Sequence, residues 1–409
     1  MVKINNLDKK QYKIAIIAPT PFYYHVPLYQ QLTNSPEIDL TVFYCSKETL
    51  RGREVEKSYQ AKGKIVNEAE LLDGYNYKFL KNYSLFPSYL RWPFGLINFG
   101  IWEEIKNGKF DAVTLQSWAN LTWWLAFSAC LKFNTPILFM TDSNILSVSL
   151  KSKWRRKLKE ILLGRFIFKR VAGFITSGTT NEQFYKAYGV PEEKMIRLYF
   201  SCGYEGVLAK ANKLKPQREN LRASFGIKEK DFVLLYVGRL SEEKLLFTLL
   251  DAYYQVNYQN KKLFLVGDGP LRSRLEKYAE KLNLKEIYFM GFLPREKVFK
   301  FYTIADVFIL PSGDETWGIV VNEAMCFGLP IITSNRVGSA VDLVKDGYNG
   351  FIFPSGDDGK LTDYIEKLIR LSTKERLLFG QRSIDIIIEW IKKIDQAQQM
   401  LKMLESLRI

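Results

Sequence analysis

The chain has 409 residues, which suggests two or three domains of ordinary size, and a hydrophobic fraction of 47% allows each domain to bury a core. The net charge is +15, and the four cysteines are widely spaced without a Cys-x-x-Cys pair, which argues against a disulfide framework or a zinc site. The chain opens on polar and charged residues unlike a signal peptide, and its most apolar window, Trp118 to Leu131, is too short to span a bilayer, so we expect a cytoplasmic protein.

The N-terminal half alternates short apolar runs with helical patterns. The runs predict strands at Lys13 to Ala18, Leu40 to Tyr44, Ala112 to Leu115, Ile137 to Met140 and Gly173 to Thr176. Such alternation is typical of a parallel α/β sheet. A polar, lysine-rich stretch from Ala209 to Asn220, which contains Pro216, then predicts a linker. We therefore expect a first domain over residues 1–205 and a second over residues 206–380.

The positive charge is concentrated in one segment, Lys151 to Arg170. The segment holds nine Lys or Arg residues against the single acid Glu160, and its apolar residues recur at near-helical spacing, as in a basic amphipathic helix. One interpretation is attachment to an anionic membrane surface, where each Lys or Arg near the surface contributes about 1 kcal/mol. The other is a solvated helix whose apolar face packs on the first domain. Since no nucleic-acid-binding module surrounds the segment, we expect no nucleic acid partner.

In the second half, glycine-containing turns follow three predicted strands. The strands and turns are Phe232 to Val237 before Gly238 and Arg239, Lys262 to Val266 before Gly267-Asp268-Gly269-Pro270, and Ile287 to Met290 before Gly291-Phe292-Leu293-Pro294. Parallel strands end at one edge of their sheet, and ligands bind there. Arg239, and Lys244 five residues later, suit a diphosphate at that edge.

A fourth apolar run, Val307 to Leu310, precedes two acids, Glu315 and Glu323, that flank Gly318. From Gly318 onward the pattern is that of a helix buried on one face. The first-turn amides of a helix have no partner within it, and the helix dipole adds about half a positive charge, so this end suits a diphosphate. Carboxylates beside it would accept hydrogen bonds from sugar or ribose hydroxyls.

The order of these motifs from Phe232 to Pro354 resembles the family 4 glycosyltransferases of the GT-B fold. The motifs are GRLSEEK, LVGDGPLRSRLE, IYFMGFLP, ADVFILPS, the two glutamates with seven residues between them, and GLPIITSNRVGSAVDLVKDGYNGFIF. The resemblance implies two facing Rossmann-like α/β domains with parallel sheets. It also implies a C-terminal helix, within residues 381–409, that crosses back to the N-terminal domain.

In that family an Arg and a Lys hold the donor diphosphate, a first Glu contacts the transferred sugar and a second Glu binds the ribose. By motif match, the resemblance assigns these roles to Arg239, Lys244, Glu315 and Glu323. Further donor-site residues implied by the match are Gly238, the backbone amides of Gly318, Ile319 and Val320, and Phe292 near the base. Asp342 stands where the family more often has Glu, in a segment that we interpret as structural.

The N-terminal half departs from the family pattern on the acceptor side. After the first strand, prolines and aromatics replace the glycines of the family, and His25, the only histidine, is there either a packing or capping residue or a functional group of the cleft. Where the family frequently has a His after the strand that ends at Met140, this chain has Asp142, which we expect beside the donor sugar as a hydrogen-bond acceptor. Three tryptophans are expected in the core rather than stacked on sugar rings: Trp118, Trp123 and Trp124.

The resemblance implies a retaining hexosyltransferase that moves a hexose from a nucleoside diphosphate sugar to a hydroxyl of a glycan or lipid-linked acceptor, in cell-surface polysaccharide or glycolipid synthesis. No Asp-x-Asp occurs in the chain, and we expect no metal and no cofactor besides the donor. A nucleotide-sugar epimerase of the same fold and a non-catalytic, sugar-binding membrane adaptor stay open as alternatives. If segment 151–170 binds lipid, the protein is expected to be peripheral on the inner face of the cell membrane.

Overall fold

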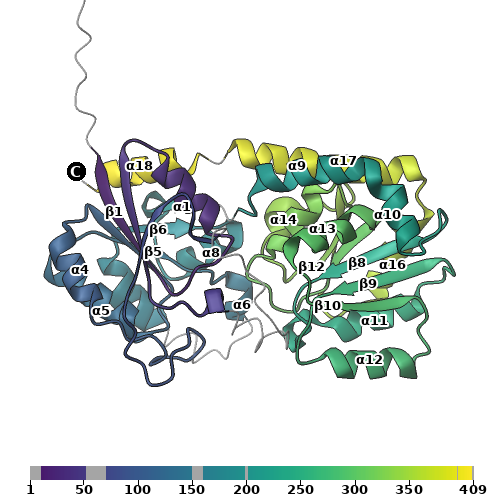
Figure 1. Ribbon diagram of the computed structural model, residues 1–409, viewed down its shortest axis with the longest axis horizontal. Coiled ribbons are helices and arrows are strands. Elements are labelled where there is room, and N and C mark those ends of the chain that lie inside the picture. The colour runs from purple at the N-terminus through teal and green to yellow at the C-terminus, as the bar shows by residue number, and fades with distance from the viewer. Residues whose placement is uncertain (1–10, 52–70, 150–159, 199–200, 394, 408–409) are drawn as a thin grey trace, which may run out of the picture.

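The computed structural model describes residues 11–51, 71–149, 160–198, 201–393 and 395–407. Two α/β domains stand side by side, each built around one parallel sheet (Figure 1). The prediction of two facing Rossmann-like domains with parallel sheets is confirmed.

The N-terminal sheet has seven strands, and residues alternate between two cores along them. Ile14 and Ile16 of the first strand belong to one buried cluster, whereas Ala15 and Ile17 belong to a second cluster on the other face. Burial on both faces is typical of parallel sheets between helix layers. The strands are β1 (Tyr12–Ala18), β2 (Ile38–Tyr44), β3 (Asn76–Phe79), β4 (Ala112–Gln116), β5 (Ile137–Met140), β6 (Gly173–Thr176) and β7 (Met195–Arg197), in the order β3-β2-β1-β4-β5-β6-β7.

The C-terminal sheet has six strands, and its centre is fully apolar. Every residue of the strand Phe232–Val237 is buried, and so is every residue of Val307–Leu310. The strands are β8 (Phe232–Val237), β9 (Lys261–Val266), β10 (Ile287–Gly291), β11 (Val307–Leu310), β12 (Ile331–Ser334) and β13 (Gly350–Phe353), in the order β10-β9-β8-β11-β12-β13.

Helices connect the strands in both domains. Those of the N-terminal domain are α1 (Val26–Thr33), α4 (Ile101–Gly108), α5 (Leu121–Lys132), α6 (Ile145–Ser149) and α8 (Thr179–Ala187). Those that follow are α9 (Tyr204–Leu214), α10 (Arg218–Ser224), α11 (Leu246–Gln255), α12 (Arg272–Lys281), α13 (Arg295–Ile304), α14 (Ile319–Cys326), α15 (Ala340–Leu343), α16 (Asp358–Arg370), α17 (Thr373–Lys392) and α18 (Gln396–Ser406). Short helical turns are η1 (Thr49–Arg51), η2 (Glu160–Ile167), η3 (Phe168–Arg170), η4 (Glu192–Lys194), η5 (Lys215–Gln217) and η6 (Glu242–Lys244).

All nine predicted strands coincide with observed strands to within two residues at each end. Four strands lie outside the predicted set: β3, β7, β12 and β13. Both β3 and β7 are edge strands, where alternation with a buried face is weak. The first three residues of β3 are exposed, and β7 has only three residues, each half-buried.

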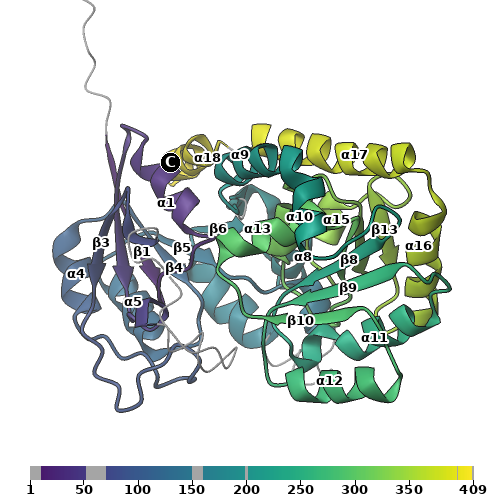
Figure 2. The same ribbon diagram turned by 45° about the vertical axis from the view of Figure 1, so that its right-hand side comes forward.

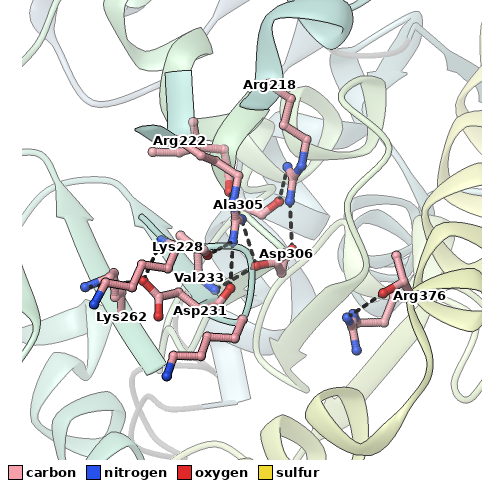
Figure 3. Close-up of polar contacts among 12 residues, drawn as sticks. Arg218, Arg222, Lys228, Asp231, Val233, Lys262, Ala305, Asp306 and Arg376 are labelled. Atoms are coloured by element: carbon pink, nitrogen blue, oxygen red, sulfur yellow. Dashed lines mark hydrogen bonds and ion pairs between the residues drawn. The ribbon is translucent and has the colours of Figure 1, made fainter. Parts of the chain in front are cut away.

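The stretch predicted as a linker, residues 209–220, is helical and lies in α9, η5 and α10. Arg218 of α10 pairs with Asp306 at 2.7 Å, and the buried Arg222 pairs with the same carboxylate at 3.1 Å (Figure 3). Asp306 also accepts a hydrogen bond from the amide of Val233 at 2.8 Å, and Arg222 donates to the carbonyl of Asp231 at 2.6 Å. These contacts hold α10 against the ends of β8 and β11, so the stretch packs as part of the C-terminal domain.

The two last helices lie on different domains. Helix α17 begins with a capping box, in which Ser372 and Glu375 each satisfy the other's amide, and it runs along the C-terminal domain. Helix α18 lies beside α1 on the N-terminal domain (Figures 1 and 2). Helix α18 also packs closely on the sheet, because a Cβ at Gly173 of β6 would lie 2.5 Å from the Sδ of Met403 in α18.

The predicted basic helix is described only in its last part, since Lys151 to Lys159 lie outside the described residues. Residues 160–167 form a stretch of π-helix, η2, which is followed by the turn η3. Ile167 and Phe168 are buried in the N-terminal core, whereas Lys169 and Arg170 are exposed. Within the described ranges, no helix combines the length and the apolar character that crossing a bilayer requires.

Candidate functional site

The loops that follow β8, β9, β10 and β11 meet at one edge of the C-terminal sheet. The amide of Gly267, after β9, donates to the carbonyl of Gly291, at the end of β10, at 2.9 Å. The amide of Gly313, after β11, donates to the carbonyl of Glu243 at 2.7 Å and so joins the loop after β11 to the loop after β8. The predicted glycine turns and the two predicted cations therefore border one surface.

Glycine is needed at two positions on this surface. A Cβ at Gly267, where φ is +139°, would lie 1.9 Å from the carbonyl oxygen of Gly238. Gly318, directly before α14, has φ +88°, a left-handed conformation that glycine adopts without strain. Gly267 thus lets the loops after β8 and β9 pack together, and Gly318 lets the chain turn into α14.

Lys244 and Glu315 bind each other at the centre of this edge. The Nζ of Lys244 and the Oε2 of Glu315 are 2.5 Å apart, and only 15% and 16% of the two side chains are exposed. Although burial of Glu243 raises its pKa, the hydrogen bond from Ser241 and the charges of Lys244 and Arg239 outweigh burial and lower that pKa. Lys244 and Arg239 therefore both lie close to the loop that carries Glu243. A cation that is partly buried forms strong hydrogen bonds with phosphate oxygens.

Helix α14 begins next to this pair, as predicted. Gly318 precedes it, and among the described residues no side chain caps its first turn. Ile319 and Val320, the first two helical residues, are half-buried. Their amides lack partners within the helix, which gives this helix start the donor pattern of an anion site. Phe292, predicted near the base of the donor, follows β10 on the same edge of the sheet and is half-buried.

Glu323, on the second turn of α14, lies in a buried network of hydrogen bonds. Its two carboxylate oxygens accept from Arg295 at 2.8 Å and from the hydroxyl of Tyr302 at 3.1 Å. Arg295 also donates to the carbonyl of Cys202, and its guanidinium lies 5.2 Å from the ring centre of Tyr23 in the N-terminal domain. A ribose bound by Glu323 would therefore share the carboxylate with Arg295.

A cavity of about 400 Å³ opens between the two domains. Loops after β1, β4 and β5 of the N-terminal domain line it, together with the loop after β11 of the C-terminal domain. The lining includes both predicted acceptor-side residues, His25 and Asp142. The other lining residues used below are Phe22, Tyr24, Trp118, Asp314 and Thr316.

Asp142 and His25 have shifted pKa values for the same physical reason. The Asp142 side chain opens to the cavity, but the protein around it removes part of its hydration and raises its pKa to about 6. His25 is buried, with its ring centre 4.6 Å from that of Tyr24 and 6.0 Å from that of Tyr29. Burial lowers the pKa of His25 to about 3, so its ring is neutral at neutral pH.

The three tryptophans of this region all pack in or against the N-terminal core, and one of them also lines the cavity. Trp123 is buried in the N-terminal core and stacks on Phe127 with ring centres 5.0 Å apart. Trp124 is half-buried and packs against the same core. Trp118 is half-buried and packs against the same core, and it also lines the cavity. It stands before α5 rather than within it, and the apolar helix pattern therefore does not apply to it.

Polar side chains join the two domains beside the cavity. The amide of the Asn144 side chain donates to the carbonyls of Glu315 and Thr316 at 3.2 and 3.0 Å. Asp342 accepts from the backbone amide of Thr179 at 2.9 Å and from its hydroxyl at 2.6 Å, at the start of α8. The residue that we interpreted as structural is therefore a contact between the domains.

Sequence reasoning missed Arg295, Tyr302 and Asn144. Arg295 directly follows the predicted turn at Phe292 and occupies the first position of α13, a location that could have drawn attention to it. Asn144 stands two residues after Asp142. Among the described residues, no three His, Cys, Asp or Glu side chains gather as metal ligands. The expectation of a metal-independent site stays a prediction.

Residues 217–384 match the family model of glycosyl transferases group 1. The matched residues lie within the C-terminal domain and its last helices. The resemblance seen in the motifs is thereby confirmed, and the family match covers both predicted cations and both predicted glutamates.

Individual relatives are glycosyltransferases by name, and each matches part of the chain. Alpha-monoglucosyldiacylglycerol synthase of Acholeplasma laidlawii is 33% identical over 179 residues, which cover 41% of this chain and 44% of that protein. Lipopolysaccharide 1,2-N-acetylglucosaminetransferase of Salmonella typhimurium is 31% identical over 237 residues, which cover 54% of this chain and 60% of that protein. The chain spans about half the length of the curated relatives it matches.

The fold extends over both domains. The crystal structure of Anabaena HepE in complex with UDP superimposes with a TM-score of 0.71 at 17% sequence identity, covering 96% of this chain and 100% of that chain. The prediction of the GT-B fold is therefore confirmed for the whole chain.

Proposed function

We propose that the protein is a retaining hexosyltransferase that moves a hexose from a nucleoside diphosphate sugar to a hydroxyl of a glycan or lipid-linked acceptor. One observation carries the proposal: the Lys244–Glu315 pair and the uncapped start of α14 border the cleft edge, and the loop that carries Glu315 also lines the cavity that holds Asp142. Diphosphate and acceptor would thus meet between the domains. The complex of HepE with UDP and the names of the relatives support this assignment.

The donor site would act mainly by electrostatic stabilisation. As the sugar departs, negative charge builds on the diphosphate, and Arg239, Lys244 and the first-turn amides of α14 would stabilise it in fixed positions. Glu315 would hold hydroxyls of the transferred sugar. Retention follows from the family resemblance, and on that basis the leaving phosphate oxygen would itself take the proton of the acceptor hydroxyl. No side chain is assigned as a strong base.

The side chains that line the cavity favour an acceptor whose reacting hydroxyl is carried by an uncharged sugar. Aromatic rings of Phe22, Tyr24 and Trp118 offer stacking faces, and the carboxylates of Asp142 and Asp314 accept hydrogen bonds from hydroxyls. Among the described residues that line the cavity, none is Lys or Arg. An acceptor hydroxyl on a neutral sugar ring fits this lining better than a phosphorylated or carboxylated group.

The proposed setting is the synthesis of cell-surface polysaccharide or glycolipid, with the protein peripheral on the inner face of the cell membrane. The net charge of segment 151–170 supports this location, because cationic residues are attracted to anionic lipid headgroups.

A screen of nucleoside diphosphate sugars tests the proposal. A donor at 100 times its dissociation constant should stabilise the native protein by about 2.7 kcal/mol, which thermal unfolding detects. The stabilising donor is then incubated with a membrane-lipid extract, in the presence of EDTA, and nucleoside diphosphate release is measured. Release that requires the extract supports the transferase. Conversion of the donor without any acceptor would indicate the epimerase, and binding without consumption would indicate the adaptor.

A further inference from the structure

The loop between β3 and α4, residues 80–100, exposes an unusual number of apolar side chains. Seven of the seventeen exposed large hydrophobic residues in the described part of the chain lie within it, and Leu85 and Trp92 are 90% and 74% exposed. Scattered exposed apolar residues are normal, whereas a contiguous group marks an interaction surface. We call this segment the apolar loop. Its exposed members are Tyr83, Leu85, Phe86, Leu90, Trp92, Phe94 and Phe99.

The apolar loop has a fixed backbone. The amide of Tyr83 donates to the carbonyl of Ile97 at 2.8 Å, which brings the two ends of the loop together. The buried side chain of Asn98 donates to the carbonyls of Cys45 and Leu80 at 3.1 and 3.2 Å and fastens the loop to the domain. Because many of its own polar groups are paired, the loop can present side chains to an apolar environment at a small desolvation cost.

The charge of the apolar loop has one sign. No Asp or Glu occurs between residues 80 and 100. The ammonium of Lys81 lies 4.8 Å from the ring centre of Tyr83, and the guanidinium of Arg91 lies 5.0 Å from that of Phe86. Aromatic residues next to cations suit the boundary between lipid headgroups and acyl chains, especially where the lipids are anionic.

The apolar loop adjoins the cavity between the domains. The ring of Tyr89 packs edge-on against Phe22 with centres 5.5 Å apart, and Phe22 lines the cavity. The amide of Tyr89 donates to the carboxylate of Glu48 at 3.0 Å, which fixes this contact. Figure 2 shows the connection between β3 and α4 projecting from the lower edge of the N-terminal domain.

We propose that the apolar loop inserts into the headgroup region of an anionic membrane and holds the acceptor side of the cavity at the lipid surface. The exposed leucines and aromatics enter the boundary between headgroups and acyl chains, and Lys81 and Arg91 contact lipid phosphates. This attachment acts in addition to the electrostatic attraction of segment 151–170. Membrane binding is measurable without any transfer reaction, and only its use for a lipid-linked acceptor rests on the proposed function.

Co-sedimentation of the full chain with phosphatidylcholine vesicles that contain phosphatidylglycerol tests the proposal. We expect Leu85→Ser/Leu90→Ser to lower the partition coefficient about tenfold or more. Fully burying even one leucine side chain in an apolar environment changes a partition coefficient by about a factor of ten or more. The matched control is Leu377→Ser/Leu378→Ser on α17, whose leucines are also exposed; it should sediment like the unmodified protein. Between about 0.1 and 1 M salt, where electrostatic attraction is screened, the difference between the two variants should persist.

Trp92 provides a second measurement on a chain with an intact fold. Vesicles with brominated acyl chains should quench tryptophan fluorescence of the unmodified protein more than that of Trp92→Phe. Equal vesicle binding by the two leucine variants, or equal quenching with and without Trp92, would overturn the proposal. If the loop instead binds a second copy of the chain, the two leucine variants bind vesicles equally, and the sedimentation coefficient of Leu85→Ser/Leu90→Ser without vesicles differs from that of the unmodified protein. Donor-induced stabilisation of the same variants shows separately whether the proposed function holds.

Discussion

The two halves of the cleft are built in different ways. On the C-terminal side, glycine turns at strand ends and one helix start position the backbone, and two cations and two carboxylates occupy places set by that backbone. On the N-terminal side, the cavity wall consists of side chains from three separate loops. Recognition of a diphosphate, which all donors share, can rely on a fixed backbone, whereas recognition of an acceptor depends on the side-chain surface of the individual protein.

The largest expected effect is on the donor side. Lys244→Ala should lower kcat by about a hundredfold to a thousandfold, because it removes a positioned cation from the departing diphosphate. Because Glu315 is mostly buried and loses its partner, the variant should also unfold at a lower temperature, so kcat is measured well below that temperature. The matched control is Lys210→Ala, which breaks an ion pair with Glu296 elsewhere in the same domain. Equal turnover by the two variants would remove Lys244 from the donor site.

The next effect concerns the carboxylate that Arg295 and Tyr302 share. Glu323→Gln should weaken donor affinity about tenfold to a hundredfold, the usual cost of losing a hydrogen bond to a charged group. Isothermal titration with the donor found by screening measures this change. The control is Glu296→Gln, next to Arg295 but paired with Lys210 in solvent. A variant with unchanged donor affinity and reduced stability would show that Glu323 only holds Arg295 and Tyr302 in place.

The smallest effect lies on the acceptor side and depends on pH. Asp142 has its pKa raised to about 6, so the folded protein loses stability as the pH rises from about 4, the ordinary pKa, through 6. Asp142→Asn should remove this loss and raise the unfolding temperature by about 2 °C near neutral pH, with no change at about pH 4. Thermal unfolding as a function of pH measures it. A pH-independent difference would mean that the Asp142 carboxylate is as hydrated as an ordinary one.

The contrast between a site set by the local backbone and a wall made of side chains from distant loops also explains which features could be predicted from the sequence. The nine predicted strands and the start of α14 follow from apolar runs and glycines, which act over a few residues and are visible in one chain. The partnership of Glu323 with Arg295 joins residues 28 positions apart, and that of Asn144 with Thr316 joins residues 172 positions apart. No local pattern encodes such pairs. The sequence analysis made no prediction for the apolar loop, because a sequence alone does not tell exposed apolar side chains from buried ones.

The path of the chain between the domains has a mechanical consequence. It passes from β7 to α9 and returns between α17 and α18, so the N-terminal domain contains both the first strand and the last helix. Because the chain crosses twice, rotation of one domain relative to the other is restricted mainly to the axis that passes through the two crossings. Contacts between the domains, such as that of the Asn144 side chain with the carbonyl of Thr316, would then separate or close together as a unit. A circular permutant opened between β7 and α9, with its original ends joined on the N-terminal domain, would keep only one crossing and gain freedom to twist.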